Sequence, residues 1–186
     1  ILPPFSYANK QGSGAYRGRM DALEGVYSYL QNIRQDYVVL AGGDTVVNLP
    51  LADAFESHLK SGADITAICS HQYKGDPRGS IYFTLGADGM VTDTAISPIS
   101  PTGYGALEVY ILSKELLLRL VGHCAAHGIP SFGRGILGSM TGALKISPYF
   151  FDGYATRLQS VESYYARSME LLDASVRADL FDPARP

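Results

Sequence analysis

The chain has 186 residues, 46% of them hydrophobic and 18% charged, which is the composition of one globular domain with an apolar core. Its formal net charge is −3, without the clustered lysines and arginines that phosphate binding needs, so we expect no nucleic-acid-binding surface. Charged residues or glycines interrupt every hydrophobic stretch before it reaches the roughly 20 residues of a membrane span, and Cys69 and Cys124 lack the spacing of a zinc site. We therefore expect a soluble cytoplasmic protein that binds neither a membrane nor nucleic acid.

The first part of the chain predicts a loop, a helix and a buried strand. Residues 1–19 are rich in proline and glycine, as in a loop. Asp21 with Glu24 resembles a capping box at the start of a helix, whose apolar positions recur at helical spacing: Leu23, Val26, Tyr27, Leu30 and Ile33. Residues 37–41 form a short apolar run that ends at two glycines, and they predict a parallel strand buried on both faces.

The remaining elements alternate in the same way. A second helical stripe runs from Leu51 to Leu59, and Gly62 is expected to end that helix in a left-handed conformation. The elements expected after it are a strand at 64–70, a hairpin of strands 80–85 and 90–96 with its turn at 87–89, a strand at 107–112, a helix from Ser113 to Gly128, a short helix from Ser131, a strand at 145–151 and a last helix along residues 161–172. The stripe Tyr164, Tyr165 and Met169 on that last helix is expected to face the core.

This order of elements predicts the α/β class. The expected architecture is a Rossmann-like mixed, mostly parallel sheet with helices on both faces and one inserted hairpin. Ligands of such sheets bind beyond the carboxyl ends of the strands, so the residues after Leu40 and after Tyr149 are the first places to look for chemistry.

Asp44 follows the strand at 37–41 after two glycines, Gly42 and Gly43. Its carboxylate would project into the ligand crevice, where the glycines let a phosphate or sugar approach the backbone. Two interpretations stay open: a Mg²⁺ ligand, or an aspartate that caps the next turn. A Mg²⁺ site for nucleotide chemistry commonly uses one or two carboxylates, so the first interpretation requires a partner elsewhere in the chain.

The segment from Tyr16 to Asp21 joins a glycine-containing loop to the start of a helix. Free amides and the helix dipole at such a start favour an anion or a base edge, which predicts a nucleotide contact. A short glycine pattern is weak evidence by itself, and an ordinary loop with a helix cap remains the alternative.

Several short motifs, in order and nearly from end to end of the chain, resemble the ADP-glucose pyrophosphorylase (glucose-1-phosphate adenylyltransferase) family. The matching segments are Tyr16–Ala22, Leu40–Asp44, Glu108–Leu112, Ser131–Gly133, Gly153–Tyr154 and Glu162–Tyr165. The resemblance implies that Gly18, Asp21 and Gly43 contact the nucleotide and that Asp44 holds Mg²⁺. It identifies no intact catalytic residue in this chain.

Three positions depart from the family pattern. Ser97 stands where the family has a lysine that grips the sugar phosphate, and Glu108 replaces a glycine beside the sugar. Arg157 stands where the family has its second metal-binding aspartate, which reverses the local charge. These departures imply a regulatory-type subunit with weak or no activity alone.

The resemblance also implies a domain organisation. Residues 1–176 would form a nucleotidyltransferase domain of the nucleotide-diphospho-sugar transferase type, incomplete at its N-terminus, and residues 177–186 a linker toward a C-terminal β-helix domain. A strand preceding residue 1 would pair beside residues 37–41, so that open edge is expected either to self-associate in the 186-residue chain or to be covered by an upstream segment of a longer protein.

The expected function is that of a regulatory subunit of glucose-1-phosphate adenylyltransferase, an enzyme that converts ATP and glucose 1-phosphate into ADP-glucose and pyrophosphate for glycogen biosynthesis. The implied partner is a catalytic homologous subunit in a hetero-oligomer. Two alternatives stay open. One is an active sugar-phosphate nucleotidyltransferase in which Arg157 or Arg134 rearranges to replace the lost cation contacts, and the other is a non-catalytic module that senses a nucleotide or a sugar phosphate.

Overall fold

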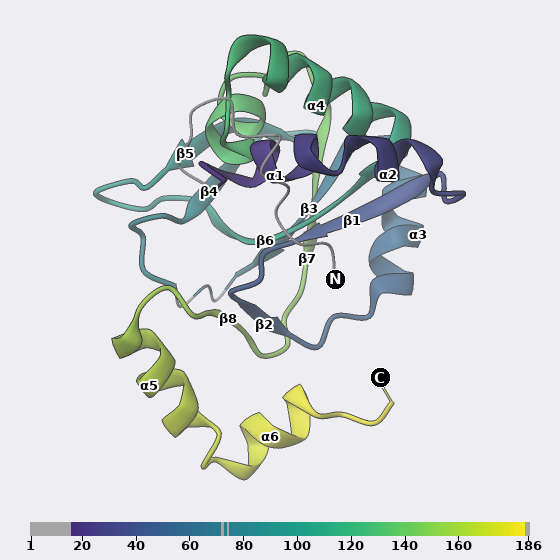
Figure 1. The fold of residues 1–186 in the computed structure, drawn as a ribbon. Coiled ribbons are helices and arrows are strands. Elements are labelled where there is room, and N and C mark those ends of the chain that lie inside the picture. Colours follow the sequence, from purple (N-terminus) through teal and green to yellow (C-terminus); the bar gives the residue numbers. More distant parts are fainter. Residues whose placement is uncertain (1–15, 72, 74, 185–186) are drawn as a thin grey trace.

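The computed structural model describes residues 16–71, 73 and 75–184, and its centre is a six-stranded sheet (Figure 1). The strands of this sheet are β1 (Tyr37–Ala41), β3 (Ile65–Ser70), β4 (Ile81–Leu85), β5 (Val91–Ile96), β6 (Tyr104–Ser113) and β7 (Ile146–Phe150). A separate two-stranded sheet joins β2 (Thr45–Val47) to β8 (Ala155–Arg157).

Six α-helices accompany these sheets in the described part of the chain. They are α1 (Arg19–Gly25), α2 (Tyr27–Asn32), α3 (Leu51–Ser61), α4 (Lys114–His127), α5 (Val161–Glu170) and α6 (Ala174–Leu180). A π-helical turn follows α4 at Gly133–Leu137. None of the described helices is both long enough and apolar enough to cross a membrane.

The main sheet is organised around β6, whose two edges carry different strands. β3 pairs with one edge along most of its length. The other edge is shared: β4 pairs with the beginning of β6 at Tyr104 and Gly105, and β1 pairs with its end from Val109 to Ser113. β5 extends the sheet beyond β4, and β7 extends it beyond β3.

The α/β class is confirmed, but the sheet is mixed and mostly antiparallel rather than mostly parallel. Among the described strands, β3 and β7 form a parallel pair, whereas β1, β3 and β4 all run antiparallel to β6. The prediction of a parallel strand buried on both faces is therefore wrong for β1, in which only Leu40 is buried. Apolar composition does not separate a central strand from an edge strand, because it carries no information about the neighbouring strand.

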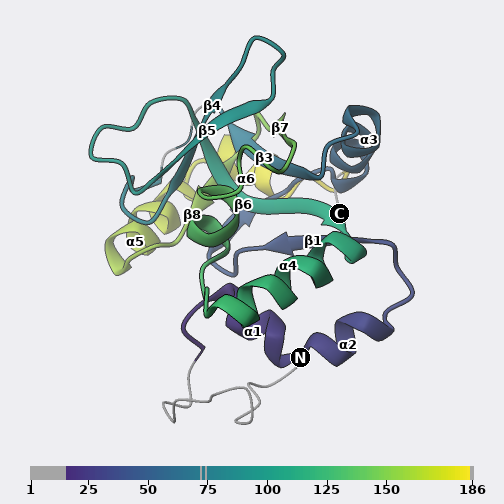
Figure 2. The same cartoon turned by 90° about the horizontal axis from the view of Figure 1, so that it is seen from above.

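Helices cover both faces of the sheet, as expected. On one face α1, α2 and α4 pack over a core that includes Met20, Tyr110 and Leu117. On the other face α3 packs through Ala54 against a core that includes Leu107. Figure 2 shows α4 beside α1 and α2, with α3 on the far side of the strands. Both cores use β6, because alternate side chains of a strand point to opposite faces.

The helix predicted from Asp21 is in fact two helices, α1 and α2. α1 begins after Gly18 without a side-chain cap, so the predicted capping box of Asp21 and Glu24 is wrong. The Asp21 carboxylate instead accepts a hydrogen bond from Arg17 Nε at 2.7 Å. Gly18 is needed for a close approach, because a Cβ at this position would lie 2.4 Å from the carbonyl oxygen of Pro130.

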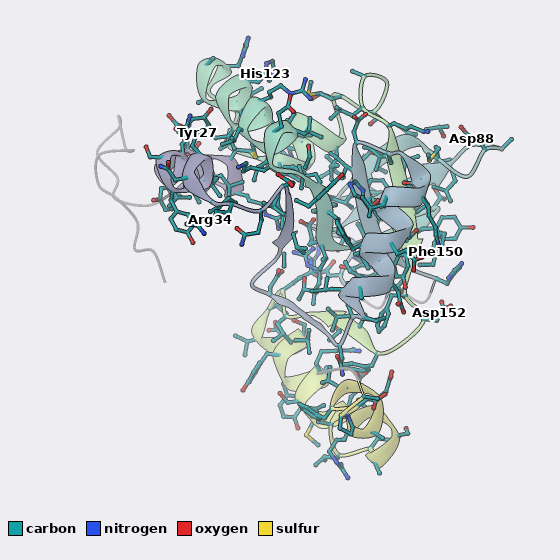
Figure 3. The ribbon with its side chains drawn as sticks, turned by 90° about the vertical axis from the view of Figure 1, so that its right-hand side faces the viewer. Tyr27, Arg34, Asp88, His123, Phe150 and Asp152 are labelled. Carbon is teal, nitrogen blue, oxygen red and sulfur yellow. The ribbon has the colours of Figure 1, made fainter. Side chains whose placement is uncertain are left out.

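Predictions that rest on local chemistry are confirmed. Gly62 ends α3 with a φ of 57° and Gly128 ends α4 with a φ of 65°, a conformation that glycine adopts without steric cost. Ser113 caps α4, and its side chain accepts a hydrogen bond from the backbone N–H of Leu116. β4 and β5 form the predicted hairpin, and Asp88 lies in its turn at the outer edge of the molecule (Figure 3).

α5 and α6 lie on the same side of the main sheet as the β2–β8 pair (Figure 1). Tyr164 and Tyr165 of α5 are 61% and 66% exposed, so the prediction that this stripe faces the core is wrong. Helical spacing correctly predicts the helix, but the described part of the chain places no apolar layer against this face. Residues 177–180 of the predicted linker lie in α6, and the division of the chain into domain and linker stays a prediction.

Candidate functional site

The candidate site lies at a gap along the shared edge of β6. β4 pairs with Gly105 and β1 pairs with Val109, and no described strand pairs with residues 106–108 on this side. The pairing of β6 with β3 also shifts register here, between Ala67 opposite Tyr110 and Cys69 opposite Ala106. Residues 107–109 of β6 thus lie opposite Ile68 alone, an excess of residues on one strand that is typical of a β-bulge, and Glu108 is the middle one of the three.

Glu108 has a φ of 59°, a left-handed conformation that a side chain makes unfavourable. Its carbonyl oxygen accepts a hydrogen bond from Gly42 N at 3.0 Å, which holds the bulge against the end of β1. Such a conformation costs about 1 kcal/mol or more in a residue other than glycine. The resemblance predicts glycine at this position, and glycine would adopt the same backbone without strain.

A cavity of about 310 Å³ opens beside Glu108. Its walls are formed by residues 17–19, Gly79, Ile81, Ile96, Ser97, Glu108 and residues 131–134. Five segments that are distant in the sequence therefore meet here: the start of α1, the start of β4 with the loop before it, the end of β5, β6 at Glu108 and the turn after α4. This convergence on one concave surface is typical of a binding site.

Four charged side chains form a continuous network at the edge of the cavity. Arg157 donates hydrogen bonds to Asp44 Oδ2 from Nη2 at 2.6 Å and from Nε at 3.1 Å. Arg157 Nη1 also lies 4.0 Å from Glu108 Oε1, and Arg19 Nη2 donates to Glu108 Oε2 at 3.1 Å. The side chains of Arg157 and Glu108 are only 11% and 12% exposed, so solvent screens these contacts weakly.

The short β2–β8 pair brings Arg157 to Asp44. Thr45 pairs with Arg157 across this sheet, and Leu158 N donates to the Asp44 carbonyl oxygen at 2.8 Å. Burial lowers the pKa of Arg157, but its hydrogen bonds and charge interaction with Asp44 outweigh this and raise the pKa above its ordinary value. Arg157 therefore stays positively charged beside Asp44 at any pH at which the protein is folded.

The structure brings most of the predicted site residues together. Gly18, Ser97 and Glu108 line the cavity, and Asp44 and Arg157 adjoin it through the network. Roles for these residues stay predictions, because the positions alone do not identify a ligand. Ser97 has a φ of 53°, and its Oγ accepts a hydrogen bond from Gly79 N at 2.9 Å.

Asp21 and Gly43 lie outside the cavity wall. The Arg17 guanidinium holds the pKa of the Asp21 carboxyl below its usual value through a direct hydrogen bond. Gly43 lies in the turn between β1 and β2, where an added Cβ would meet no described atom within 4 Å. Close packing against the rest of the protein therefore does not explain why position 43 is a glycine. A nucleotide contact by Asp21 or by Gly43 stays a prediction.

Arg19 is a residue of this site that the sequence analysis did not single out. It lies within the predicted nucleotide-contact segment, directly after Gly18, which is the one feature of the sequence that points to it. Its guanidinium lies over the rings of Tyr110 and Phe132, at 5.8 and 5.9 Å from their centroids. Its Nη1 atom is buried and has no hydrogen-bond partner among the described residues.

The donor set around Asp44 does not fit a Mg²⁺ ion held by two carboxylates. Arg157 occupies the position of the expected second carboxylate and donates two hydrogen bonds to Asp44. The described residues contain no group of three or more His, Cys, Asp or Glu that could hold a metal ion. A role for Asp44 in metal binding stays a prediction, and it would require Arg157 to move away.

A second polar region lies beyond the carboxyl ends of β3 and β7, where the sheet topology also directs a search for ligands. The His71 ring stacks on Phe150 with 4.1 Å between centroids, and its Nδ1 lies 3.0 Å from Asp152 Oδ1. Phe150 and Asp152 lie close together there (Figure 3). The neighbouring cavity, of about 210 Å³, is lined by residues 152–155 and by Arg167, which is paired with Glu170. We assign no chemistry to this region.

Comparison with known proteins confirms the predicted family resemblance. No family model matches the chain. A glucose-1-phosphate adenylyltransferase of Thermomicrobium roseum is 28% identical over 187 residues, which cover 98% of this chain and 43% of that protein. One from Halalkalibacterium halodurans is 28% identical over 189 residues, 99% of this chain and 49% of that protein. The glycogen biosynthesis protein GlgD of Bacillus subtilis is 26% identical over 173 residues, 93% of this chain and 40% of that protein. The chain therefore spans less than half the length of these curated relatives.

Proposed function

We propose that this chain is part of a regulatory-type subunit of glucose-1-phosphate adenylyltransferase and that it acts with a catalytic homologous subunit in ADP-glucose synthesis. The whole protein would then have weak or no activity alone. The names of the relatives support the pathway, because they include both glucose-1-phosphate adenylyltransferases and a glycogen biosynthesis protein. This chain's own side chains at positions 44, 97 and 157 support the impaired role.

The observation that carries the proposal is the contact of 2.6 Å between Arg157 Nη2 and Asp44 Oδ2. Transfer of a nucleotidyl group requires positive charge that neutralises the developing negative charge on the phosphates, and Mg²⁺ commonly supplies it. A guanidinium already bound to Asp44 repels a divalent cation, because like charges a few ångströms apart in a partly buried site interact unfavourably. Arg157 therefore works against the metal site that Asp44 would otherwise offer.

Ser97, in the wall of the cavity, supports the same conclusion. Its hydroxyl is neutral and already accepts a hydrogen bond from the Gly79 backbone N–H. It cannot replace the charge of a lysine toward a sugar phosphate, because a charge-assisted hydrogen bond is roughly twice as strong as one between neutral groups.

The proposal is tested with the whole protein from which this chain comes, expressed alone and together with a catalytic homologue. We expect little or no Mg²⁺-dependent formation of ADP-glucose from ATP and glucose 1-phosphate by the protein alone. We expect the two proteins to co-purify and the homologue's affinity for its substrates or effectors to change. A protein that forms ADP-glucose alone at the rate of the catalytic homologue would refute the regulatory role and support an active enzyme instead.

A further inference from the structure

We propose that Glu108 is a built-in anion: its carboxylate occupies the arginine-lined cavity and thereby excludes phosphate-bearing ligands from it. The inference deepens the proposed function, on which it rests only for the choice of ligand. Glu108 would be the residue that determines what the cavity rejects, whereas the proposed function concerns the activity of the whole protein.

The charges that line the cavity point to an anion. Arg17, Arg19 and Arg134 contribute to its wall, and Glu108 is the one carboxylate among the lining residues. Arg17 is already paired with Asp21. Arg19 packs against the aromatic rings of the core and donates to Glu108 at 3.1 Å. Glu108 therefore stands where an exogenous anion would meet the inward-facing arginine.

Arg19 retains a donor that Glu108 does not use. Its Nη1 is buried without a hydrogen-bond partner among the described residues, and buried donors of this kind are rare in folded proteins. A carboxylate that reaches only Nη2 leaves this donor unsatisfied. A phosphate group has more acceptor oxygens and could bind both nitrogens of the guanidinium, which is the geometry that arginine favours.

The backbone is arranged to keep Glu108 in this position. Glu108 and Ser97 are the residues other than glycine with a positive φ in the described chain, and both line the same cavity. Strain at Glu108 is offset by three contacts: Arg19 and Arg157 at its carboxylate and Gly42 N at its carbonyl oxygen. Unfavourable backbone geometry that persists because the surroundings hold it is a mark of a functional position.

Exclusion follows from charge and burial. A phosphate that entered the cavity would approach the Glu108 carboxylate with like charge, and solvent screens this repulsion only weakly because the carboxylate is largely buried. To take over Arg19 it would have to displace Glu108, whose side chain is only 12% exposed and would be left without one of its two cationic neighbours. The wild-type cavity is thus expected to bind phosphate-bearing ligands weakly or not at all.

Isothermal titration calorimetry of the 186-residue chain without divalent metal tests this inference. The ligands are pyrophosphate and glucose 1-phosphate, and the two titrations separate a bare phosphoanion site from one that requires a sugar. The variants are Glu108→Gln, which removes the charge at constant shape, and Glu108→Gly, which also removes the bulk and relieves the positive φ. Glu115→Gln on the exposed start of α4 is the matched control.

We expect both Glu108 variants to bind at least one of the ligands roughly tenfold more tightly than the wild type, or to bind where the wild type does not. Glu115→Gln should behave as the wild type, and adding Arg19→Ala to Glu108→Gly should abolish the gain. Circular dichroism and thermal unfolding identify the variants that are folded, and the conservative Gln variant serves if the Gly variant is not.

Two results would overturn the inference. One is a folded Glu108→Gln or Glu108→Gly chain that binds both ligands no more tightly than the wild type. The other is a wild-type chain that already binds either ligand through Arg19, which would instead support a sensing module. Both results concern binding and not catalysis. Activity of the whole protein alone would contradict the proposed function, but it would not change what the Glu108 variants show about ligand binding.

Discussion

Arg157 holds two carboxylates at once, Asp44 and Glu108, and it is nearly buried. Removing it leaves both carboxylates without their shared cation. Breaking a fully buried pair in this way costs roughly 3–5 kcal/mol. Because Asp44 is partly exposed, we expect Arg157→Ala to lower the free energy of unfolding by a smaller amount, about 2 kcal/mol.

Urea unfolding of the wild type and of Arg157→Ala measures this cost, with Arg119→Ala on the exposed face of α4 as the matched control. The control should change the stability by no more than about 0.5 kcal/mol. Equal effects of the two substitutions would show that the network contributes nothing to folding.

Restoring the expected charges tests the site assignment at the same scale. We expect Ser97→Lys, Glu108→Gly and Arg157→Asp, combined in the whole protein, to raise Mg²⁺-dependent formation of ADP-glucose, because together they return a cation for the sugar phosphate and a carboxylate pair for the metal. The variant that keeps Glu108 should gain less, since Asp44, Glu108 and a new aspartate at 157 would then crowd one site. No gain from the triple variant over the wild type would mean that these positions do not form the active site.

α3 carries a histidine whose titration should appear in the stability of the protein. His58 is buried against β3, and its Nδ1 lies 2.8 Å from Thr66 Oγ1. Burial lowers the pKa of His58, which the charge of Asp64 opposes only in part. The unfolded chain therefore binds a proton more readily than the folded chain. The stability from neutral His58 is fully present above the unfolded-state pKa of about 6.5 and is lost as the pH falls toward the folded-state pKa.

We expect the wild type to lose more stability than His58→Gln between pH 8 and about pH 5.5, a range chosen around the ordinary histidine pKa. Urea unfolding at several pH values measures the difference, in which the contributions of unrelated carboxylates cancel. His123→Gln on the exposed surface of α4 should retain the wild-type dependence. Parallel curves for the wild type and His58→Gln would contradict the prediction.

The start of α4 depends on one hydroxyl. Ser113 Oγ accepts a hydrogen bond from Leu116 N at 3.1 Å, and Lys114 N donates to the Asp36 carbonyl oxygen. Replacing Ser113 with alanine leaves an N–H of the first turn without its acceptor, which costs about 1 kcal/mol. Ser113→Thr keeps the acceptor and should cost less. Thermal unfolding distinguishes the two, and equal shifts in Tm would exclude the cap as the cause.

Elements whose limits are set by neighbouring residues were predictable from the sequence. α3, α4 and the β4–β5 hairpin follow from glycines, a capping serine and a turn dipeptide, each of which acts within a few residues. The direction of β1 and the exposure of α5 were not predictable in this way. Both depend on which segment packs alongside, and hydrophobic spacing is the same for an edge strand or an exposed helix as for a buried one.

At the scale of the whole molecule, the sequence identified most of the positions of the candidate site but not their contacts. The family resemblance indicates Ser97, Glu108 and Arg157 as departures, and the fold brings these positions to one region. The pairing of Asp44 with Arg157 joins residues 113 apart in the sequence, and that of Arg19 with Glu108 joins residues 89 apart. Only the tertiary fold sets such distances, and no local pattern specifies the positive φ at Glu108.

The edge formed by β1 predicts how the chain behaves in solution. β1 pairs with β6 on one side, and among the described residues no strand pairs with its other side. Tyr37 and Val39 are 39% and 45% exposed, and a hollow of about 500 Å³ lined by β1 and by Phe55 of α3 lies beside them. An exposed apolar edge strand offers unpaired backbone groups to another chain.

We therefore expect the 186-residue chain to self-associate as its concentration rises, and Val39→Lys to reduce this, because a lysine on an edge strand disfavours pairing. Size-exclusion chromatography with light scattering gives the mass. Leu172→Lys, at an exposed apolar position after α5, is the control for a general gain in solubility. A wild-type chain that stays at its monomer mass of 20.0 kDa over the whole concentration range would show that this edge does not mediate self-association.

The mutual pairing of Arg19, Asp44, Glu108 and Arg157 also constrains how this sequence can evolve. Replacing Arg157 leaves Asp44 without its counterion, and replacing Glu108 leaves Arg19 without its counterion, so a change at either position is opposed until another has changed. Exchange of Arg157 for aspartate as a first step would gather three carboxylates around one point. Loss of Glu108 as a first step leaves Arg157 still paired with Asp44 and frees only Arg19, at the wall of an open cavity. For a lineage that regained two metal-binding carboxylates, the loss of stability along the way would be smallest if Glu108 were replaced before Arg157.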